Sequence, residues 1–350
     1  MIVAKVTLRD FRSYAALDLE LAPGLVLAVG PNGAGKTNLL EALHVGTQGF
    51  SPRTRTDAHL IRFGAERGRI ALKGARGGSQ VESEIVLGVN EAKRATLNGA
   101  RLSAAEQLRS ELATLVFTPD RLAVVKGGPA VRRAYFDRAL GRLYPARAVV
   151  PTEYAAAIAQ RNASLRRVSF GASSRDALAP WTQRVAELGA ALVVSRVETV
   201  AEVGPRFSER AGELGLAAEV RYEGEAPTAE ALEARLDQDL DRGTTGLGPH
   251  LDDIELTSGG RELRRFGSQG EQRLAVLALI LAEAELLTER GPAPPLLLLD
   301  DVLSELDERR RRILAERVGS AGQSFITSTV ASALPVDPAQ LVEVTPGSAR

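Results

Sequence analysis

The chemistry of this chain is most visible in one run of eight residues, Gly30-Pro31-Asn32-Gly33-Ala34-Gly35-Lys36-Thr37. Such glycines let backbone N–H groups close around an anionic phosphate, Lys36 adds a positive charge, and the Thr37 hydroxyl can bind magnesium. The run follows an apolar stretch, 25–29, and opens a helical pattern, 36–45, whose positive N-terminus faces the same anion. Because only five of the 44 basic residues are lysines, a lysine at this position is improbable by chance. The run therefore predicts a phosphate-binding loop.

Two carboxylates, Asp300 and Asp301, follow an unbroken apolar run at 296–299. A strand buried on both faces needs such a run, and an acid at its carboxyl end lies in the crevice where open α/β sheets bind ligands. We expect Asp300 to hold magnesium through water, together with Thr37. Asp301 would orient or deprotonate the water that attacks the γ-phosphate. Asp301 and Lys36 are therefore the candidate catalytic residues.

A third motif opens a helix that is expected to run to about residue 289, and it consists of Ser268, Gln269, Gly270 and Glu271. At the level of local structure, the motif predicts a capping box, with Ser268 as the N-cap and the Glu271 side chain reaching back to it. A serine, a glycine and bare amides at a helix N-terminus also form an anion site, separate from the phosphate loop. The motif therefore predicts a cap and a second anion-binding position.

The elements that must position these motifs follow from the periodicity of the apolar residues. Alternation predicts paired strands at 2–8 and 17–21, before a turn that leads into the apolar run 25–29, and an antiparallel meander over 68–73, 81–89 and 95–97 beside a parallel core sheet. Helical spacing marks the middle of the chain, at 129–143, 151–167 and 177–210. Strands return at 217–222, 253–256 and 324–327, and the tail 346–350 is expected to be disordered.

The composition excludes several kinds of site. A chain of 350 residues without cysteine has no disulfide, thiolate zinc site or cysteine nucleophile. Three scattered histidines, His44, His59 and His250, do not predict a metal cluster. The N-terminus lacks the apolar segment of a secretory signal, and no apolar run reaches the roughly 18 residues of a membrane span. We therefore expect a soluble, cytoplasmic protein.

Charge is unevenly distributed, although the net charge is zero. Residues 53–76 include seven basic and two acidic side chains, and residues 121–167 include ten and two. Residues 198–242 reverse the balance, with twelve acidic and five basic side chains. Local positive fields of this kind can hold a phosphate backbone. Solvated helix faces produce the same pattern, so charge alone does not establish DNA binding.

Taken in order, the three motifs and the later run Ser304-Glu305-Leu306-Asp307 resemble the motifs of ABC-type ATPase heads. The start of the chain, 8–14, is similar to SMC-like and RecF-like heads, in which the motif's arginine, here Arg12, lies near the nucleotide. Three further stretches, 116–122, 126–137 and 248–253, resemble the RecF family specifically. On this resemblance, which extends from residue 1 to about 329, the chain is identified as a member of the bacterial RecF family.

The resemblance implies an α/β fold: an ABC-type ATPase head, with a mixed β core and a flanking antiparallel sheet, and an inserted, mainly helical second lobe. The expected divisions are 1–116 and 246–350 for the two halves of the head, and 117–245 for the lobe. The implied cofactors are ATP and Mg²⁺, with Thr37 and Asp300 as metal ligands. The implied nucleotide-binding residues are Gly30, Pro31, Asn32, Gly33, Ala34, Gly35, Lys36, Thr37, Asn38 and Arg12.

The family also implies a mechanism in which ATP lies between two subunits. The residues from Ser268 to Glu271 of one copy would face the phosphate loop of the other, so ATP would favour a dimer and ADP would release it. In the RecF family this clamp binds DNA at gaps and single-strand/duplex junctions and, with RecO and RecR, promotes RecA loading. The expected DNA-binding residues are Arg132, Arg133, Arg138 and Arg142, and a second group of Arg53, Arg55 and Arg62.

The chain departs from the wider ABC pattern at a few positions. Thr118 and Pro119 stand where a magnesium-sensing glutamine is usual, and Gln48 lies too early in the chain to replace it. Asp301 replaces a glutamate, and residues 327–329 lie where a histidine is expected. We therefore expect slow ATP hydrolysis.

Two other functions fit the phosphate loop. An ATPase subunit of a transporter would need a membrane partner and would ignore DNA. A small-molecule phosphotransferase would stay monomeric with ATP and consume a second substrate.

Overall fold

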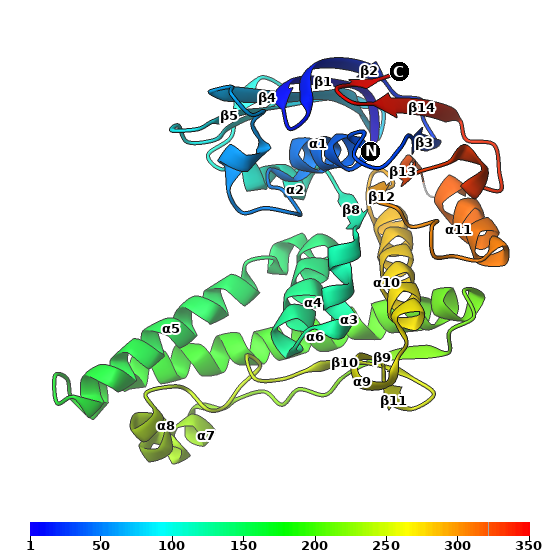
Figure 1. Ribbon diagram of the computed structural model, residues 1–350. Helices are drawn as coiled ribbons and strands as arrows, with labels where there is room; N and C mark the ends of the chain where they lie inside the picture. Colours follow the sequence, from blue (N-terminus) through cyan, green and yellow to red (C-terminus); the bar gives the residue numbers. More distant parts are fainter. Residues whose placement is uncertain (321) are drawn as a thin grey trace. The chain divides into compact units, whose positions relative to one another are not determined.

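The computed structural model describes residues 1–320 and 322–350, and the chain divides into two units. The first unit joins both ends of the chain, Met1–Leu122 and Val276–Arg350, and the second, Ala123–Ala275, is inserted between them (Figure 1). The second unit continues beyond the lobe expected at 117–245, because strand β10 (Ile254–Ser258) pairs with β9 (Ala218–Tyr222).

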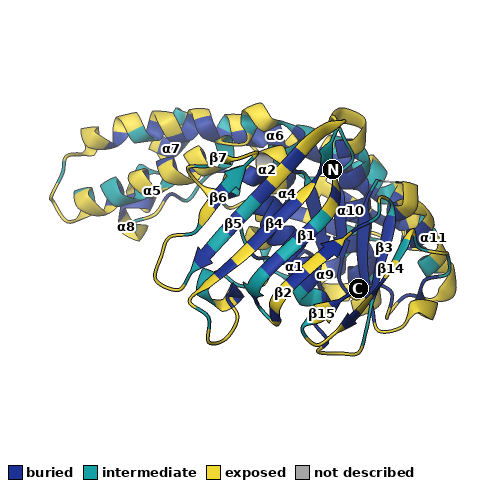
Figure 2. Cartoon of the chain, turned by 90° about the horizontal axis from the view of Figure 1, so that it is seen from above, coloured by how far each residue is buried: buried dark blue, intermediate teal, exposed yellow. Residues whose placement is uncertain are grey.

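An antiparallel sheet of six strands forms one layer of the first unit, as the alternating sequence pattern predicts. Buried and exposed residues alternate along much of its long strands (Figure 2), so one face of the sheet packs on the core and the other meets water. Its strand order is β2 (Tyr14–Glu20), β1 (Ile2–Phe11), β4 (Arg67–Arg76), β5 (Ser79–Gly88), β6 (Arg94–Leu97) and β7 (Ala100–Arg101).

A second sheet of six strands carries the motifs of the phosphate loop and the acid pair. Its central strands are parallel, and β3 and β12 are continuously apolar because both of their faces are covered. Leu299 is level with Phe117 on one side and Ile326 on the other, so these three strands end at one edge. Its order is β15 (Ser348–Ala349), β14 (Gln340–Thr345), β3 (Leu25–Val29), β13 (Ser324–Ser328), β12 (Leu296–Leu299) and β8 (Thr114–Phe117).

The tail that was expected to be disordered from residue 346 is ordered. β15 turns back on β14, and Glu343 and Arg350 exchange backbone hydrogen bonds of 2.7 and 3.1 Å. Ala349 is buried. The expectation was wrong because these short strands gain their stability from β3, which is more than 300 residues away along the chain.

Helix α1 (Lys36–Gln48) packs between the two sheets and contacts both (Figure 1). Eleven of its thirteen residues are buried, so its polar side chains need partners. The Thr47 hydroxyl donates to the Leu43 carbonyl at 2.9 Å, and Gln48 Nε2 donates to the Leu112 carbonyl at 2.6 Å. Gln48 is therefore a core residue that ties α1 to the end of α2 (Leu108–Glu111).

Helices dominate the second unit, as the periodicity predicts. The longest, α6 (Ala179–Glu213), packs against α4 (Pro129–Leu143), α5 (Val150–Ser169) and β9. Strands β9, β10 and β11 (Arg261–Glu262) form a small antiparallel sheet. The unit also contains the short α-helices α3 (Ala123–Lys126), α7 (Ala229–Ala234), α8 (Leu236–Arg242) and α9 (Leu263–Phe266).

Helix α10 (Gln269–Arg290) begins at the predicted capping motif and is buried over most of its length. In the first unit, α11 (Glu308–Ser320) follows β12 along the chain. Among the residues that the structure describes, no helix combines the length and the apolar character that crossing a bilayer requires.

Candidate functional site

The phosphate loop connects β3 to α1 and has a backbone that requires its glycines. Gly35, which precedes the helix, has φ 113°, and a Cβ at this position would lie 2.9 Å from the Tyr14 hydroxyl oxygen. A Cβ at Gly30 would lie 2.2 Å from the backbone oxygen of Val344, too close for any side chain. The Tyr14 hydroxyl donates to the Gly35 carbonyl at 3.1 Å, and burial raises the pKa of Tyr14 to about 12. Strands β2 and β14 thus hold the loop.

The Lys36 ammonium group is held by the loop itself. Its Nζ donates to the carbonyl oxygens of Gly30 and Pro31, at 2.6 and 3.0 Å. Burial lowers the pKa of Lys36, and the nearby carboxylates of Asp301 and Asp300 oppose this shift. Because carbonyl groups hold the ammonium without neutralising it, Lys36 is placed to attract an anion into the loop.

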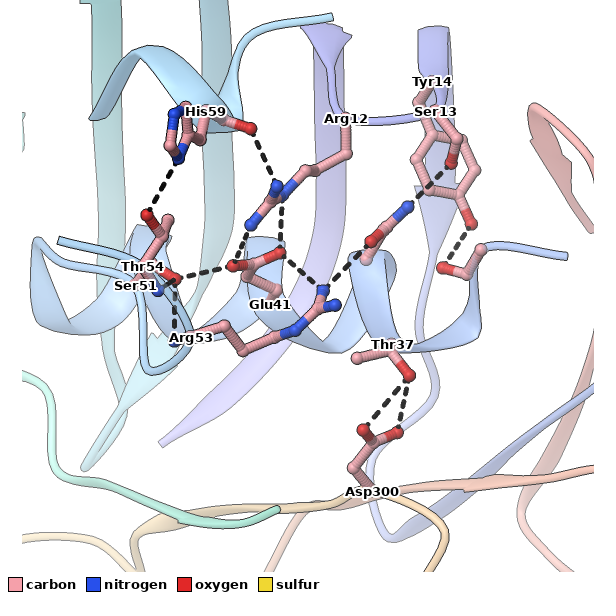
Figure 3. Close-up of polar contacts among 12 residues, drawn as sticks. Arg12, Ser13, Tyr14, Thr37, Glu41, Ser51, Arg53, Thr54, His59 and Asp300 are labelled. Carbon is pink, nitrogen blue, oxygen red and sulfur yellow. Dashed lines mark hydrogen bonds and ion pairs between the residues drawn. The ribbon is translucent and has the colours of Figure 1, made fainter. Parts of the chain in front are cut away.

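Asp300 is hydrogen-bonded to hydroxyl groups from two other elements. Thr37 Oγ1, in the first turn of α1, lies 3.0 and 3.1 Å from the two carboxylate oxygens (Figure 3). Thr327 Oγ1, on β13, donates to the same carboxylate at 2.7 Å. Burial raises the pKa of Asp300, although both hydroxyl groups oppose the shift. The structure therefore brings together the two expected magnesium ligands and adds Thr327, which the sequence analysis did not identify.

Asp301, the next residue, is exposed and has an unusual backbone. Its φ is 48°, in the left-handed region that non-glycine residues rarely adopt. Its N–H donates to Thr327 Oγ1 at 2.9 Å. The Thr327 hydroxyl therefore fixes both members of the acid pair.

A cleft of about 400 Å³ lies over the phosphate loop. It is lined by Asn32, Gly33, Gly35, Lys36, Thr37, Asn38, Arg53, Pro119, Asp300, Asp301, Thr327 and Thr329. Within the described residues, no three His, Cys, Asp or Glu side chains gather into a metal site. The oxygen donors of Thr37 and Asp300 nevertheless fit Mg²⁺, which usually takes few protein ligands and keeps waters and phosphate oxygens. The cleft therefore has the groups that bind a phosphate chain with its cation.

Arg12, expected at the nucleotide, does not line this cleft. Its guanidinium donates to both carboxylate oxygens of Glu41, at 2.9 and 2.8 Å, and to the His59 carbonyl at 2.8 Å (Figure 3). Glu41 is completely buried on α1 and also accepts a hydrogen bond of 3.2 Å from Arg53. Arg53, expected at the DNA surface, lines the cleft. Arg12 lies in this network because a buried carboxylate must be paired with cations, and the linear sequence does not show that pairing.

In the second unit, the capping box at the start of α10 is confirmed. The Ser268 N–H and hydroxyl both donate to Glu271 Oε2, at 2.7 and 2.9 Å, and the Glu271 N–H donates to Ser268 Oγ at 3.2 Å. These hydrogen bonds lower the pKa of Glu271. Ser268, Gln269 and Gly270 are exposed, so the start of the helix is both rigid and open to solvent.

Two arginines expected at the DNA surface have structural partners instead. Arg132 is 1% exposed, and its guanidinium donates to both carboxylate oxygens of Asp253. Arg133 is half-buried, donates to the Asp252 carbonyl, and has a pKa lowered by burial. The prediction that Arg132 lies at the surface was therefore wrong. A count of charges along the chain does not show that the fold brings the Asp253 carboxylate beside α4. Of the other expected DNA contacts, the exposed ones are Arg53, Arg55, Arg62 and Arg138, and Arg142 is half-buried.

Sequence comparison places the chain among known proteins. The family model described as RecF/RecN/SMC N terminal domain matches residues 2–348. A protein of Anaeromyxobacter dehalogenans, named DNA replication and repair protein RecF, is 39% identical over 352 residues, which cover 94% of this chain and 92% of that protein.

Comparison of structures agrees. A solved structure described as the recombination mediator protein RecF with ATP in the RecFOR pathway is 28% identical, with a TM-score of 0.88 over 99% of this chain and 96% of that one. An SMC head bound to the C-winged helix domain of ScpA is 17% identical, with a TM-score of 0.64 over 100% and 97%, and shows the fold alone. The fold is therefore that of an ABC-type ATPase head. The chain belongs to the bacterial RecF family of DNA replication and repair proteins.

Proposed function

We propose that this protein is an ATP-dependent DNA-binding clamp of recombinational repair, which dimerises on ATP and hydrolyses it slowly. It binds single-strand/duplex junctions or gaps and, with RecO and RecR, promotes RecA loading. Two features of the chain carry the proposal: the cleft over the phosphate loop, and the capped, exposed start of α10, where a serine, a glycine and backbone N–H groups suit an anion. The ATP-bound RecF structure described as part of the RecFOR pathway supports the nucleotide and the two partner proteins.

The cleft supplies one half of the nucleotide site. Lys36 and the backbone N–H groups of the loop would bind the β- and γ-phosphates. Thr37 and Asp300, already within 3.1 Å of each other, would hold Mg²⁺. When bound, this ion neutralises charge on the phosphate oxygens. Arg53 adds a positive charge at the edge of the same cleft.

The glycine at position 270 supports the inference that the second half of the nucleotide site comes from another copy of the chain. It lies in the first turn of α10 without a left-handed φ, and a Cβ there would meet only Ser268 Oγ, at 4.0 Å. One chain alone therefore has room for a side chain. Glycine costs roughly 0.5–1 kcal/mol relative to alanine in the middle of a helix, and this is the upper limit for the first turn. A glycine is favoured at this position if the terminal phosphate of a nucleotide bound to a second copy approaches the backbone N–H groups of the first turn closely. We therefore assign Ser268 and Gly270 to the γ-phosphate in trans.

The rate of ATP hydrolysis would set how long this dimer lasts. Asp301 is the candidate base, exposed in the cleft and held by Thr327. An aspartate side chain is shorter than the usual glutamate, so it reaches the attacking water less well and turnover is slow. Since the γ-phosphate contacts both copies, ATP favours the dimer and ADP releases it.

DNA contacts in this proposal come from arginines that are exposed or half-buried. Arg138 and Arg142 on α4 remain candidates, as do Arg55 and Arg62 in the first unit, whereas Arg132 is excluded by its burial. Such contacts to the phosphate backbone release counterions, so DNA affinity should fall steeply with salt concentration.

Light scattering with each nucleotide tests the proposal. We expect a dimer with ATP and a monomer with ADP, and DNA binding that a transporter ATPase would not show. Ser268→Arg should bind ATP as a monomer but fail to dimerise, and Ser174→Arg, an exposed serine between α5 and α6, is the matched control. Normal dimerisation of Ser268→Arg would leave only the capping role for Ser268. A wild-type mass that does not change with saturating ATP would refute the clamp and favour the phosphotransferase.

A further inference from the structure

Phe63 is a completely exposed aromatic side chain, with 100% of its surface open to solvent. It lies in the turn 62–65, where the Ala65 N–H donates to the Arg62 carbonyl at 3.0 Å and Gly64 has φ 86°. In a turn with glycine in this conformation at the third position, the residue before the glycine lies at the outer corner. Since burial would stabilise a phenylalanine, packing within the unit does not explain its position.

The backbone that carries Phe63 is fixed to the core. The Arg62 N–H donates to the Asp10 carbonyl, and the Arg12 N–H donates to the Leu60 carbonyl, both at 2.8 Å. Leu60, three residues before Phe63, is completely buried. The ring is therefore presented on an anchored turn, and its exposure does not come from a loose loop.

The same turn is connected to the phosphate site. Arg12 bonds the His59 carbonyl with one guanidinium nitrogen and the Glu41 carboxylate of α1 with two others (Figure 3). Arg53, the second partner of Glu41, lines the cleft. Asp10 and Arg12 have φ of 45° and 51°, and strained backbone of this kind clusters at functional sites. The segment that ends in Phe63 is therefore connected, through Arg12 and Glu41, to the helix that follows the phosphate loop.

Exposed arginines lie on the same segment of the chain as Phe63. Arg62, the residue directly before it, is 47% exposed, and its ion pair with Asp10 is long, at 3.5 Å, and open to water. Arg55 is exposed, and none of the residues 1–320 and 322–350 forms a hydrogen bond or ion pair with its side chain. An open aromatic ring next to an exposed cation suits single-stranded nucleic acid, because charge holds the phosphates while the bases stack on the ring.

We propose that Phe63 stacks on the open base at a single-strand/duplex junction, with Arg55 and Arg62 binding the neighbouring phosphates. Inside a continuous duplex both faces of every base are covered, whereas a base at a junction has an open face for the ring. The inference rests on the proposed DNA-binding function and deepens it, because it names the side chain that distinguishes a junction from a duplex.

Fluorescence anisotropy with ATP, on a gapped circular duplex and on the same small circle without the gap, tests the inference, because neither DNA has a free end. Phe63→Ala should weaken binding to the gapped DNA by roughly tenfold to a hundredfold, the value of one stacked base. Binding to the closed circle and its salt dependence should not change, because no charge is removed. Phe63→Trp should retain the preference for the gap. Phe170→Ala removes a ring that is 85% exposed between α5 and α6 and is the matched control.

A 2-aminopurine base placed at the junction gives an independent readout, since stacking on Phe63 should change its fluorescence in the wild type and not in Phe63→Ala. Equal gap preference and equal fluorescence in the two proteins would overturn the inference while the DNA-binding function stands. Loss of the ATP dimer in Phe63→Ala, with DNA selectivity unchanged, would assign the ring to a second copy of the chain and overturn it as well. A wild type that binds no DNA would refute the proposed function itself.

Discussion

Replacing Gly270 with alanine should stabilise the single chain and weaken the ATP dimer. A Cβ at this position has no neighbour closer than 4.0 Å, so the substitution creates no clash within the chain. It removes the helix penalty of glycine, a gain of up to about 1 kcal/mol. For a protein of this size, that gain raises the melting temperature by roughly 1–4 °C.

The expected effect on the dimer has the opposite sign. If the γ-phosphate of a second copy is hydrogen-bonded to this turn, a methyl group beside the N–H keeps the phosphate away. One hydrogen bond to a charged group contributes roughly 1.5–3 kcal/mol. The dissociation constant of the ATP dimer should therefore rise at least about tenfold for each hydrogen bond that the methyl group prevents.

Two measurements check this prediction: calorimetry without nucleotide, and light scattering over a range of protein concentrations with ATP. Gly212→Ala is the matched control, because Gly212 is an exposed helical glycine of α6 whose Cβ would also meet nothing within 4 Å. It should raise the melting temperature and leave the dimer unchanged. If Gly270→Ala dimerises as tightly as the wild type, the γ-phosphate does not approach this turn and the trans assignment is wrong.

Three further substitutions probe the site and its surroundings. Asp301→Asn should bind ATP and dimerise but hydrolyse ATP at least about a hundredfold more slowly; unchanged single-turnover hydrolysis would remove its role as base. Arg132→Ala should lower the stability by roughly 3 kcal/mol, because it leaves Asp253 without its buried partner; thermal unfolding measures this, and an unchanged melting temperature with weakened DNA binding would return Arg132 to the DNA surface. Tyr14→Phe should reduce the alkaline loss of stability. The pKa of Tyr14 is raised from 10.0 to about 12, so the unfolded chain ionises first and wild-type stability falls between these two pH values; equal slopes for both proteins in melting curves over this range would contradict the assignment.

Much of the fold and of the candidate site could be predicted from short, local sequence motifs. The phosphate loop, the apolar strand ending in Asp300 and Asp301, and the capping box of Ser268 and Glu271 are contiguous runs. Their geometry follows from glycine conformation, apolar continuity and side-chain reach within a few residues. The long helices of the second unit are equally local, because their apolar residues repeat with the helical period. For these features, a residue's neighbours along the chain are also its neighbours in space.

Positions that depend on distant partners could not be assigned in this way. The exposed or buried state of an arginine depends on whether the fold brings a carboxylate to it, as it brings Asp253 to Arg132 and Glu41 to both Arg12 and Arg53. Counting charges along the chain therefore placed Arg132 at the surface, although the fold buries it against Asp253.

The sequence by itself determined that this chain has a glycine-rich loop between a strand and a helix, and an acid pair at the end of a buried strand. Only the tertiary structure decided which hydroxyl groups hold that acid, because Thr327 reaches Asp300 through the parallel pairing of β13 with β12. It also decided that the last residues form strands, since their stability comes from pairing with β3. Bonding along the chain specifies the chemistry of each segment, and packing between segments specifies which side chains are near enough to act on one another.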